Sequence, residues 1–374
     1  MRIGVPRECK DGERRVGLAP AGVRALIADG HSVAIALGAG DAVSFTDAEY
    51  RNAGAEMIAS PEALWSCDLI VKVKELQPSE FALLVSGTTV FGFAQLHRDR
   101  DLLAAVLGAG VRIIAYETVR DDTGALPLLA PMSRIAGRLA PFAGAQSLAT
   151  DRGGSGVLLT GVDDVAPANV VVIGAGSVGS EAARVAAQFG CRVRVFSRGQ
   201  ARLTALCRSL KELGHDVETF PLSGADDAQF RAAVSDADLV IGAVLEPGRL
   251  SPKLLQRSHV ASMRRGSAFV DVGIDQGGIA ETSRMTQLSA PTYVDEGVVH
   301  YAVPNMPALV ARTATLALTQ ATLPYIRALA GRGIAQALAA DQGLRAGAMV
   351  WQGGVVHAGL AADVNVPLAS VAWA

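Results

Sequence analysis

The chain has 374 residues, of which 50% are hydrophobic and 19% are charged. This length exceeds what one hydrophobic core usually serves, so we expect two domains, and the composition excludes wholesale disorder. Lysine and arginine number 34 against 36 aspartates and glutamates, which gives a net charge of −2. No basic excess is therefore available to drive binding to nucleic acid or to a membrane surface.

Short β-branched runs alternate with helical patterns through the first third of the chain. We expect strands at residues 32–36, 68–73, 89–93 and 111–116, and helices at residues 20–28 and 101–107. A glycine-rich loop at residues 151–156 is typical of a domain boundary. These elements predict a first α/β unit.

A second and clearer series of alternating elements follows this loop. We expect strands at residues 169–173, 192–196, 238–242 and 268–272, helices at residues 181–188, 200–213 and 227–234, and a last long helix at residues 308–329. Strands that alternate with crossover helices predict a parallel sheet with right-handed connections.

Neither the cysteines nor the chain ends indicate secretion or metal binding. The four cysteines (Cys9, Cys67, Cys191 and Cys207) are scattered and form no C-x-x-C pair, so we predict no disulfide framework and no metal site. The first eight residues include three charged ones, Arg2, Arg7 and Glu8, and contain no apolar signal region. Residues 316–326 form an apolar stretch of only about half a membrane span. We expect a cytoplasmic protein that does not insert into membranes.

The strongest local motif is GAGSVG at residues 174–179. It directly follows a five-residue β run and opens an alanine-rich helix, which is the context of a dinucleotide-binding turn. In such a turn Gly174, Gly176 and Gly179 let the backbone approach a pyrophosphate, which lies at the helix N-terminus with Ser177 and Val178. A purely structural turn is the alternative interpretation.

The end of the following strand bears on the choice of nucleotide. NAD-binding sites place an acidic residue there, about 20 residues after the glycines, whereas this chain has Ser197 and Arg198, with Arg202 one helical turn later. A serine can donate a hydrogen bond to a 2′-phosphate and an arginine can pair with its charge. We therefore expect a preference for NADP(H), with NAD(H) possible, although an exposed arginine is common at a helix start.

Segments along nearly the whole chain resemble the alanine dehydrogenase family, which also includes the nucleotide-binding subunit of proton-pumping transhydrogenase. They read RIGVPRE (residues 2–8), ERRVGLAP (13–20), VKVKE (71–75), AYETV (115–119), LPLLAPMS (126–133), DLVIGAVL (238–245), DVGIDQGG (271–278) and VPNMP (303–307).

The resemblance implies an α/β fold of two Rossmann-like, doubly wound parallel-sheet domains with an active-site cleft between them. Residues 1–130 and 305–374 would form a discontinuous substrate domain, and residues 131–304 the inserted dinucleotide-binding domain. The implied activity is hydride transfer between NADP(H) and an L-amino acid, or a 2-oxo acid plus ammonia. A homo-oligomer, either a dimer or a hexamer, is also implied.

The resemblance also assigns roles to individual residues. Arg15 would bind the substrate carboxylate, for which a guanidinium fork is suited. Lys74 would bind the carbonyl oxygen or the carboxylate, and Asp275 would be the active-site aspartate. Glu117, Met132 and Asn305 would line the substrate. The implied cofactor-binding residues are Ser133, Gly174, Gly176, Ser177, Val178, Gly179, Ser197, Arg198, Arg202, Val244, Leu245, Val272, Asp275, Asn305 and Met306.

For several of these residues a structural explanation stays open. Arg15 could be a surface arginine and Lys74 a lysine whose stem alone is buried. Asp275 could cap its loop, and Met132 could simply pack.

Two departures from the family pattern bear on the chemistry. Where alanine dehydrogenases read F-x-F-L-H-L with a catalytic histidine, this chain has FGFAQLH at residues 91–97, so Gln95 stands at the histidine position. Glutamine hydrogen-bonds but does not titrate. A second departure is Arg134, where alanine dehydrogenases usually carry an acid.

Three explanations of Gln95 remain open. His97 could act in its place if the strand continues to residue 97, since alternate strand residues share a face. Lys74 or Asp275 could carry the proton unaided. Otherwise the reaction differs, as in reduction of an imine or condensation of an amine with a 2-oxo acid by saccharopine- or opine-forming relatives. A non-catalytic, transhydrogenase-like nucleotide-binding subunit is a further alternative.

Overall fold

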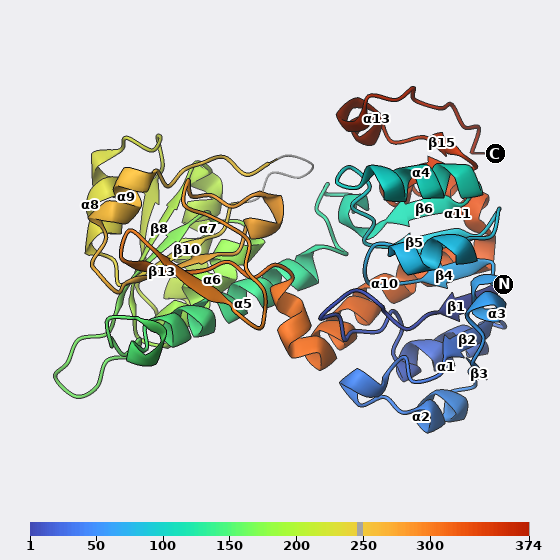
Figure 1. Ribbon diagram of the computed structural model, residues 1–374, viewed down its shortest axis with the longest axis horizontal. Helices are drawn as coiled ribbons and strands as arrows, with labels where there is room; N and C mark the ends of the chain where they lie inside the picture. Colours follow the sequence, from blue (N-terminus) through green and yellow to red (C-terminus); the bar gives the residue numbers. More distant parts are fainter. Residues whose placement is uncertain (245–249, 374) are drawn as a thin grey trace. The chain divides into compact units, whose positions relative to one another are not determined.

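A computed structural model describes residues 1–244 and 250–373. The chain divides into two compact units, one formed by Met1–Met132 with Ala308–Ala374 and the other by Ser133–Pro307. These boundaries lie within a few residues of those expected at 130/131 and 304/305. Each unit is built on its own sheet (Figure 1).

The first unit contains an eight-stranded sheet in the order β15-β14-β6-β5-β4-β1-β2-β3. Its strands are β1 (Arg2–Val5), β2 (Ser32–Ala36), β3 (Glu56–Ile58), β4 (Leu69–Val71), β5 (Thr89–Gly92), β6 (Arg112–Ala115), β14 (Ala348–Trp351) and β15 (Gly354–Val355). Its helices are α1 (Pro20–Ala28), α2 (Asp47–Asn52), α3 (Pro61–Trp65), α4 (Arg100–Ala109), α10 (Ala311–Arg332), α11 (Ile334–Ala340), α12 (Gln342–Arg345) and α13 (Ala358–Val364). Strands β1 to β6 are parallel, whereas β14 and β15 are added antiparallel at one edge.

The second unit contains a seven-stranded sheet in the order β12-β13-β11-β10-β7-β8-β9. Its strands are β7 (Asn169–Ile173), β8 (Arg192–Ser197), β9 (Glu218–Pro221), β10 (Leu239–Gly242), β11 (Ala268–Asp271), β12 (Thr292–Asp295) and β13 (Val298–Tyr301). Its helices are α6 (Ser177–Gln188), α7 (Gln200–Lys211), α8 (Ala228–Asp236) and α9 (Arg257–Ser262), and it holds most of α5 (Ala130–Ser147). Only β12 runs antiparallel to its neighbour.

The alternating side chains of β7 explain why helices cover both faces of this sheet. Val170 and Val172 pack into one buried cluster with residues of α5, α6 and α7. Val171 and Ile173 pack into a second cluster with residues of α8 and α9. Successive strand residues point to opposite faces, and burying each such side chain contributes about 1.5–3 kcal/mol. The four successive apolar residues Val170–Ile173 therefore favour a doubly wound sheet, as expected.

Both sheets share one feature that positions a site. In the first, the chain leaves β1 for β2 on one side and later resumes at β4 on the other side. In the second, β7 and β10 have the same relation. Ligands of open α/β sheets bind beyond the carboxyl ends of the strands at such a switch point.

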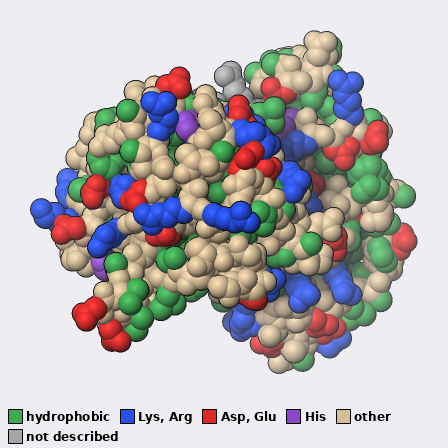
Figure 2. Space-filling model, turned by 60° about the vertical axis from the view of Figure 1, so that its left-hand side comes forward, with side chains coloured by type: hydrophobic (Ala, Val, Ile, Leu, Met, Phe, Trp, Pro, Cys, Tyr) green, Lys and Arg blue, Asp and Glu red, His purple; other side chains and the backbone are tan. Residues whose placement is uncertain are grey.

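The surface and the helices add two observations. On the face shown in Figure 2, lysine and arginine side chains lie among aspartate and glutamate side chains. None of the helices formed by the described residues combines the length and the apolar character needed to cross a bilayer.

Candidate active site

Four sequence-predicted residues of the first unit follow the carboxyl ends of four parallel strands. Arg15 lies in the loop after β1, and Lys74 follows β4. Gln95 follows β5, and Glu117 lies in a short 3-10 helix, η3 (Tyr116–Thr118), after β6. The structure therefore gathers these residues at the edge of the sheet where an α/β fold binds its ligand.

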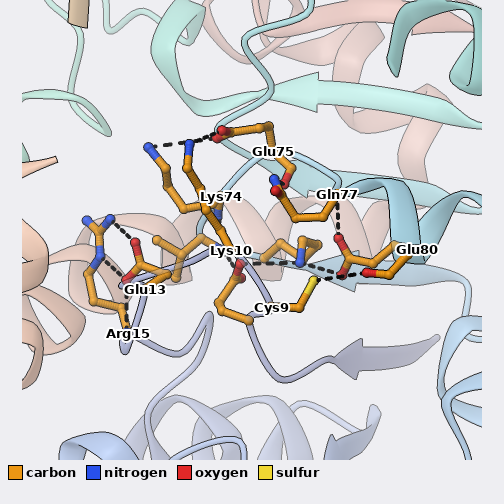
Figure 3. A network of polar contacts seen from close by, with 12 residues as sticks. Cys9, Lys10, Glu13, Arg15, Lys74, Glu75, Gln77 and Glu80 are labelled. Atoms are coloured by element: carbon orange, nitrogen blue, oxygen red, sulfur yellow. Dashed lines mark hydrogen bonds and ion pairs between the residues drawn. The ribbon is translucent and has the colours of Figure 1, made fainter. Parts of the chain in front are cut away.

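Arg15 is buried and held in one orientation. Its side chain is only 2% exposed, so it is not a surface arginine. The guanidinium donates from Nε to Glu13 Oε1 at 2.7 Å and from Nη2 to Glu13 Oε2 at 2.6 Å (Figure 3). Its Nη1 lies 3.0 Å from the sulfur of Met132. Met132 thus contacts Arg15 directly, and the fork is pre-organised by a buried carboxylate.

Lys74 is also buried, with 8% of the residue exposed. Its Nζ lies 3.8 Å from Oε2 of Glu75, and Lys10 pairs with the other oxygen of the same carboxylate (Figure 3). Burial raises the pKa of Glu75, but Lys74 and Lys10 outweigh this effect and hold the pKa below its ordinary value. The Lys74 ammonium is thus buried beside a carboxylate.

A second ion cluster supports the segment that carries Lys74. Lys72 is fully buried and donates to Glu80 at 2.7 Å and to Glu8 at 3.3 Å. Glu8 also accepts the backbone N–H of Val73 at 2.6 Å and that of Lys74 at 3.4 Å. Burial raises the pKa of Glu8. Glu8, Lys72 and Glu80 were not expected from sequence, because burial of an acid at a strand end has no sequence signature.

The structure contradicts one explanation of Gln95. Strand β5 ends at Gly92, and Gln95 has a left-handed backbone with φ of 46°. His97 therefore does not continue a strand face from Gln95, and its side chain is exposed. The pKa of His97 is lowered, because partial burial of the ring and the charge of Arg98 outweigh the opposite effect of Asp363. The expectation that His97 replaces the family histidine by strand alternation is wrong.

Glu117 holds the backbone on which Gln95 stands. Its Oε1 accepts the N–H of Ala94 at 3.1 Å and that of Gln95 at 2.9 Å. The carboxylate is half-buried, and burial raises its pKa although these N–H groups and Lys74 act in the opposite direction. Glu117 thus contacts the segment of Gln95 directly, and its pKa is affected by the charge of Lys74.

In the second unit, the glycine turn has the geometry expected of a pyrophosphate site. Gly174 has φ of 109°, and a Cβ on Gly179 would lie 1.8 Å from the carbonyl oxygen of Gly174. A Cβ on Gly176 would meet nothing within 4 Å, so open space lies in front of the helix N-terminus formed by Ser177 and Val178. Backbone N–H groups that face open space at a helix N-terminus suit an anion.

The residues expected to select the nucleotide follow β8. Ser197 ends the strand and is half-buried, with its Oγ 3.4 Å from the N–H of Gly199. Arg198 and Arg202 are exposed. The stem of Arg202 lies against Gly199, since a Cβ there would be 3.7 Å from Arg202 Cδ. A serine and two arginines thus stand where an NAD site carries an acid.

The remaining expected cofactor residues of this unit lie in α5 and after β10, β11 and β13. Val244 and Val272 are half-buried and follow strand ends, Met306 is buried, and Ser133 is half-buried in α5. Asp275 lies in a 3-10 turn, η5 (Ile274–Gln276), and accepts the N–H of Asn305 at 3.4 Å. Asp275 therefore also holds the turn that carries Asn305. Leu245 lies outside the described residues.

A clamp of six hydrogen bonds fixes the loop around Asp275. Lys253 Nζ donates to the carbonyls of Gly277, Gly278 and Ala280 at 2.7–2.9 Å. In addition, the buried Asp271 accepts two backbone N–H groups, of Gly273 and Ile279, and the Ser283 hydroxyl. Neither clamp residue was expected from sequence as a site residue.

Replacing Lys253 by methionine is expected to lower kcat by about ten- to a hundredfold, because small displacements of catalytic groups cost that much. The dissociation constant for NADPH should change little, since the glycine turn is untouched. Steady-state kinetics and NADPH fluorescence titration measure the two quantities. Lys211→Met, at an exposed position of α7, is the matched control. Equal kcat in both variants would remove the positioning role.

The chain matches known proteins over its full length. Its residues 4–136 match the family model for the alanine dehydrogenase/PNT N-terminal domain, and residues 140–358 match that for the C-terminal domain. It is 46% identical to an alanine dehydrogenase of Halomonas elongata, with 96% of each chain covered. It is 43% identical to one of Mycolicibacterium smegmatis over 100% of this chain and 99% of that one.

Solved structures agree. An L-alanine dehydrogenase superposes with a TM-score of 0.92 at 44% identity, covering 98% of this chain and 99% of that one. The transhydrogenase of Sinorhizobium meliloti superposes with a TM-score of 0.80 at 24% identity, covering 96% and 99%, which shows a shared fold. The chain therefore belongs to the alanine dehydrogenase/PNT family.

Proposed function

We propose that this chain is an NADP(H)-linked dehydrogenase that interconverts L-alanine or a related L-amino acid with its 2-oxo acid and ammonia. Its sequence identity of 43–46% to alanine dehydrogenases over nearly the whole chain makes it an amino-acid dehydrogenase that acts on CH–NH2 groups with a nicotinamide cofactor. The observation that carries the proposal is the pair of buried cations, Arg15 and Lys74, at the carboxyl edge of the first sheet.

The chemistry divides between these two cations. Arg15 would bind the substrate carboxylate through its planar fork, which Glu13 already holds in orientation. Lys74 would donate to the carbonyl oxygen, where negative charge develops as the carbon is attacked. A buried ammonium does this without the reorganisation that water requires. Met132, against the guanidinium, would contribute an apolar wall beside the reacting carbon.

The second unit fits a nicotinamide dinucleotide. The open space in front of Gly176 and the close approach of Gly179 to Gly174 match what a pyrophosphate needs. When bound, the cofactor supplies the hydride for amination or accepts it in deamination. Overall, 2-oxo acid, ammonium, NADPH and one proton give amino acid, NADP+ and water. Asp275, after β11, is assigned to the active site where the nicotinamide ring would lie, and Ser133, Val244, Val272, Asn305 and Met306 to contact the cofactor.

A screen of NADPH and NADH oxidation would test the proposal. It crosses a panel of 2-oxo acids, pyruvate first, with ammonia and with primary amines, and follows the absorbance of the reduced nicotinamide. We expect turnover with pyruvate or a close homologue and ammonia. Turnover only with primary amines would instead support the second candidate function, the formation of secondary amines. Gln95 favours this candidate, because it stands in place of the titrating histidine of the family that uses ammonia. No turnover with any pair would refute both.

The preference for NADP(H) makes its own prediction. Ser197→Asp places a carboxylate beside the expected 2′-phosphate, and like charges brought together cost several kcal/mol. The ratio of kcat/KM for NADP+ over NAD+ should therefore fall by about a hundredfold, since about 1.4 kcal/mol is a factor of ten. Ser197→Ala is the control, and it should change the ratio much less. A ratio that is the same in both variants contradicts the preference.

Assembly and location stay predictions. A homo-oligomer would show as a dimer or hexamer mass by light scattering. We also propose a cytoplasmic location, which the scattered cysteines favour.

A further inference from the structure

The amination chemistry needs a group that titrates beside Gln95, and Gln95 cannot be that group. Dehydration of the carbinolamine requires a proton on the departing hydroxyl, and a glutamine amide does not exchange protons in this way. His97 is exposed beyond a left-handed turn, and its ring is near Arg98 and Asp363 rather than in line with Gln95. Lys74 is committed to the substrate oxygen and lies beside Glu75.

Glu117 is a titratable side chain that the fold places directly against the backbone of Gln95. Strands β5 and β6 are neighbours, and Gly92 pairs with Ala115 at their carboxyl ends. Gln95 and Glu117 follow these two residues closely, so the fold brings them together. The contact is direct, because the N–H groups of Ala94 and Gln95 both donate to Glu117 Oε1.

The two oxygens of Glu117 are used unequally. Oε1 accepts at 2.9 and 3.1 Å, whereas Oε2 lies farther from the N–H of Ala94, at 3.3 Å. Oε2 is thus the oxygen better suited to carry a proton. The carboxyl is half-buried, and the positive charge of Lys74, from the segment after β4, acts to lower its pKa. Burial raises the pKa of Glu117, which moves it toward the operating range of a general acid.

We propose that Glu117 is the general acid and base of the amination half-reaction and replaces the histidine that this chain lacks at position 95. This rests on the proposed function. In the dehydration step, the Glu117 carboxyl gives its proton to the hydroxyl of the carbinolamine. The C–O bond breaks with its electron pair on oxygen, water leaves, and the nitrogen lone pair forms the C=N bond. The products are an iminium ion, water and the Glu117 carboxylate, which solvent reprotonates.

The sign of the pH dependence follows from this step. Amination needs the protonated carboxyl, so its rate should fall as pH rises through the pKa of Glu117. Deamination needs the carboxylate to remove a proton from water, so its rate should rise over the same range. Lys74 and the backbone N–H groups favour the carboxylate, whereas burial favours the acid.

The test compares the wild type with Glu117→Gln, Gln95→His and the double variant, and uses Glu75→Gln as the matched control beside Lys74. Glutamine keeps an acceptor oxygen for the N–H groups of Ala94 and Gln95, so it separates proton transfer from positioning. We expect Glu117→Gln to lower kcat by about 10²–10⁴-fold. It should also abolish the change of rate with pH that the Glu117 pKa produces, in both amination and deamination. Glu75→Gln should retain this pH dependence. Histidine at position 95 should restore at least about tenfold of kcat in the Glu117→Gln background.

Three outcomes overturn the inference. The first is a Glu117→Gln variant with near-normal kcat. The second is a Glu117→Gln variant with a raised KM but the same pH dependence of the rate as the wild type. The third is a double variant whose kcat is no higher than that of Glu117→Gln. The infrared difference between the wild type and Glu117→Gln, titrated without cofactor, is an independent readout and should contain the carbonyl band of one protonated carboxyl. A wild type that turns over no substrate pair refutes the proposed function instead, so the two failures are distinct.

Discussion

Replacing Lys74 by methionine is expected to lower kcat/KM for the 2-oxo acid by about 10²–10³. Methionine matches the length of the lysine stem but removes the ammonium that would stabilise the developing negative charge on oxygen. Lys74 is only 8% exposed, so water does not readily replace it. Most of the loss should fall on kcat, because this charge develops in the transition state. Initial rates of NADPH oxidation over a range of oxo-acid concentrations measure both constants.

Lys10→Met is the control for this variant. Lys10 pairs with the same carboxylate, Glu75, but its side chain is 32% exposed. Removing it should change kcat/KM by less than about tenfold, since exposed ion pairs contribute about 0–1 kcal/mol. If both variants lose activity equally, the effect comes from the ion cluster around Glu75, and Lys74 has no separate part in the chemistry.

Much of the fold could be predicted, because buried parallel strands are uniform in sequence. The run Asn169–Ile173 was expected as a strand and is β7, with the same bounds. Helix α6 was expected from residue 181 but begins at Ser177. The first turn of this helix contains Gly179 of the glycine motif, and glycine lowers the helix propensity of that segment. The helix expected from residue 308 begins at Ala311, after a 3-10 turn.

Elements without a strong periodic pattern were missed. Helix α5 contains Gly137, Pro141 and Gly144, and glycine and proline have the lowest helix propensities, so the sequence of this segment does not predict a helix. The added strands β14 and β15 are short and lie at the edge of the first sheet. Tertiary packing overrides local preference at such places, and the sequence carries no signal of it.

The candidate site divides in the same way. Arg15 and Lys74 could be named because the segments around them resemble a family, and the structure shows both to be buried. Their supports could not be named. Glu13 and Glu8 acquire their roles only when the loop after β1 returns to the sheet edge. Those contacts depend on distances between side chains, which spacing along the chain does not encode.

The fully buried Lys72 leads to the second large effect, which concerns stability. Lys72→Met is expected to lower the free energy of unfolding by about 3–5 kcal/mol at neutral pH, because it leaves Glu8 and Glu80 buried without their cation. Burial lowers the pKa of Lys72, but these two carboxylates outweigh it and hold the pKa above its ordinary value. A raised lysine pKa contributes stability that is fully present at neutral pH and is lost only in strong alkali.

The pH dependence of this loss distinguishes uncompensated charge from a packing defect. In Lys72→Met the carboxyl of Glu8 stays buried most easily when it is protonated, and burial already raises its pKa. A raised acid pKa destabilises the folded state as pH rises through it, so the deficit should shrink as pH falls toward about 4, the range of an ordinary glutamate. Urea unfolding of both proteins across this range measures the deficit. The triple variant Lys72→Met, Glu8→Gln, Glu80→Gln, which removes all three charges together, should recover part of the stability. A deficit that is independent of pH and is not reduced in the triple variant would mean that lost packing, and not the buried carboxylates, destabilises the protein.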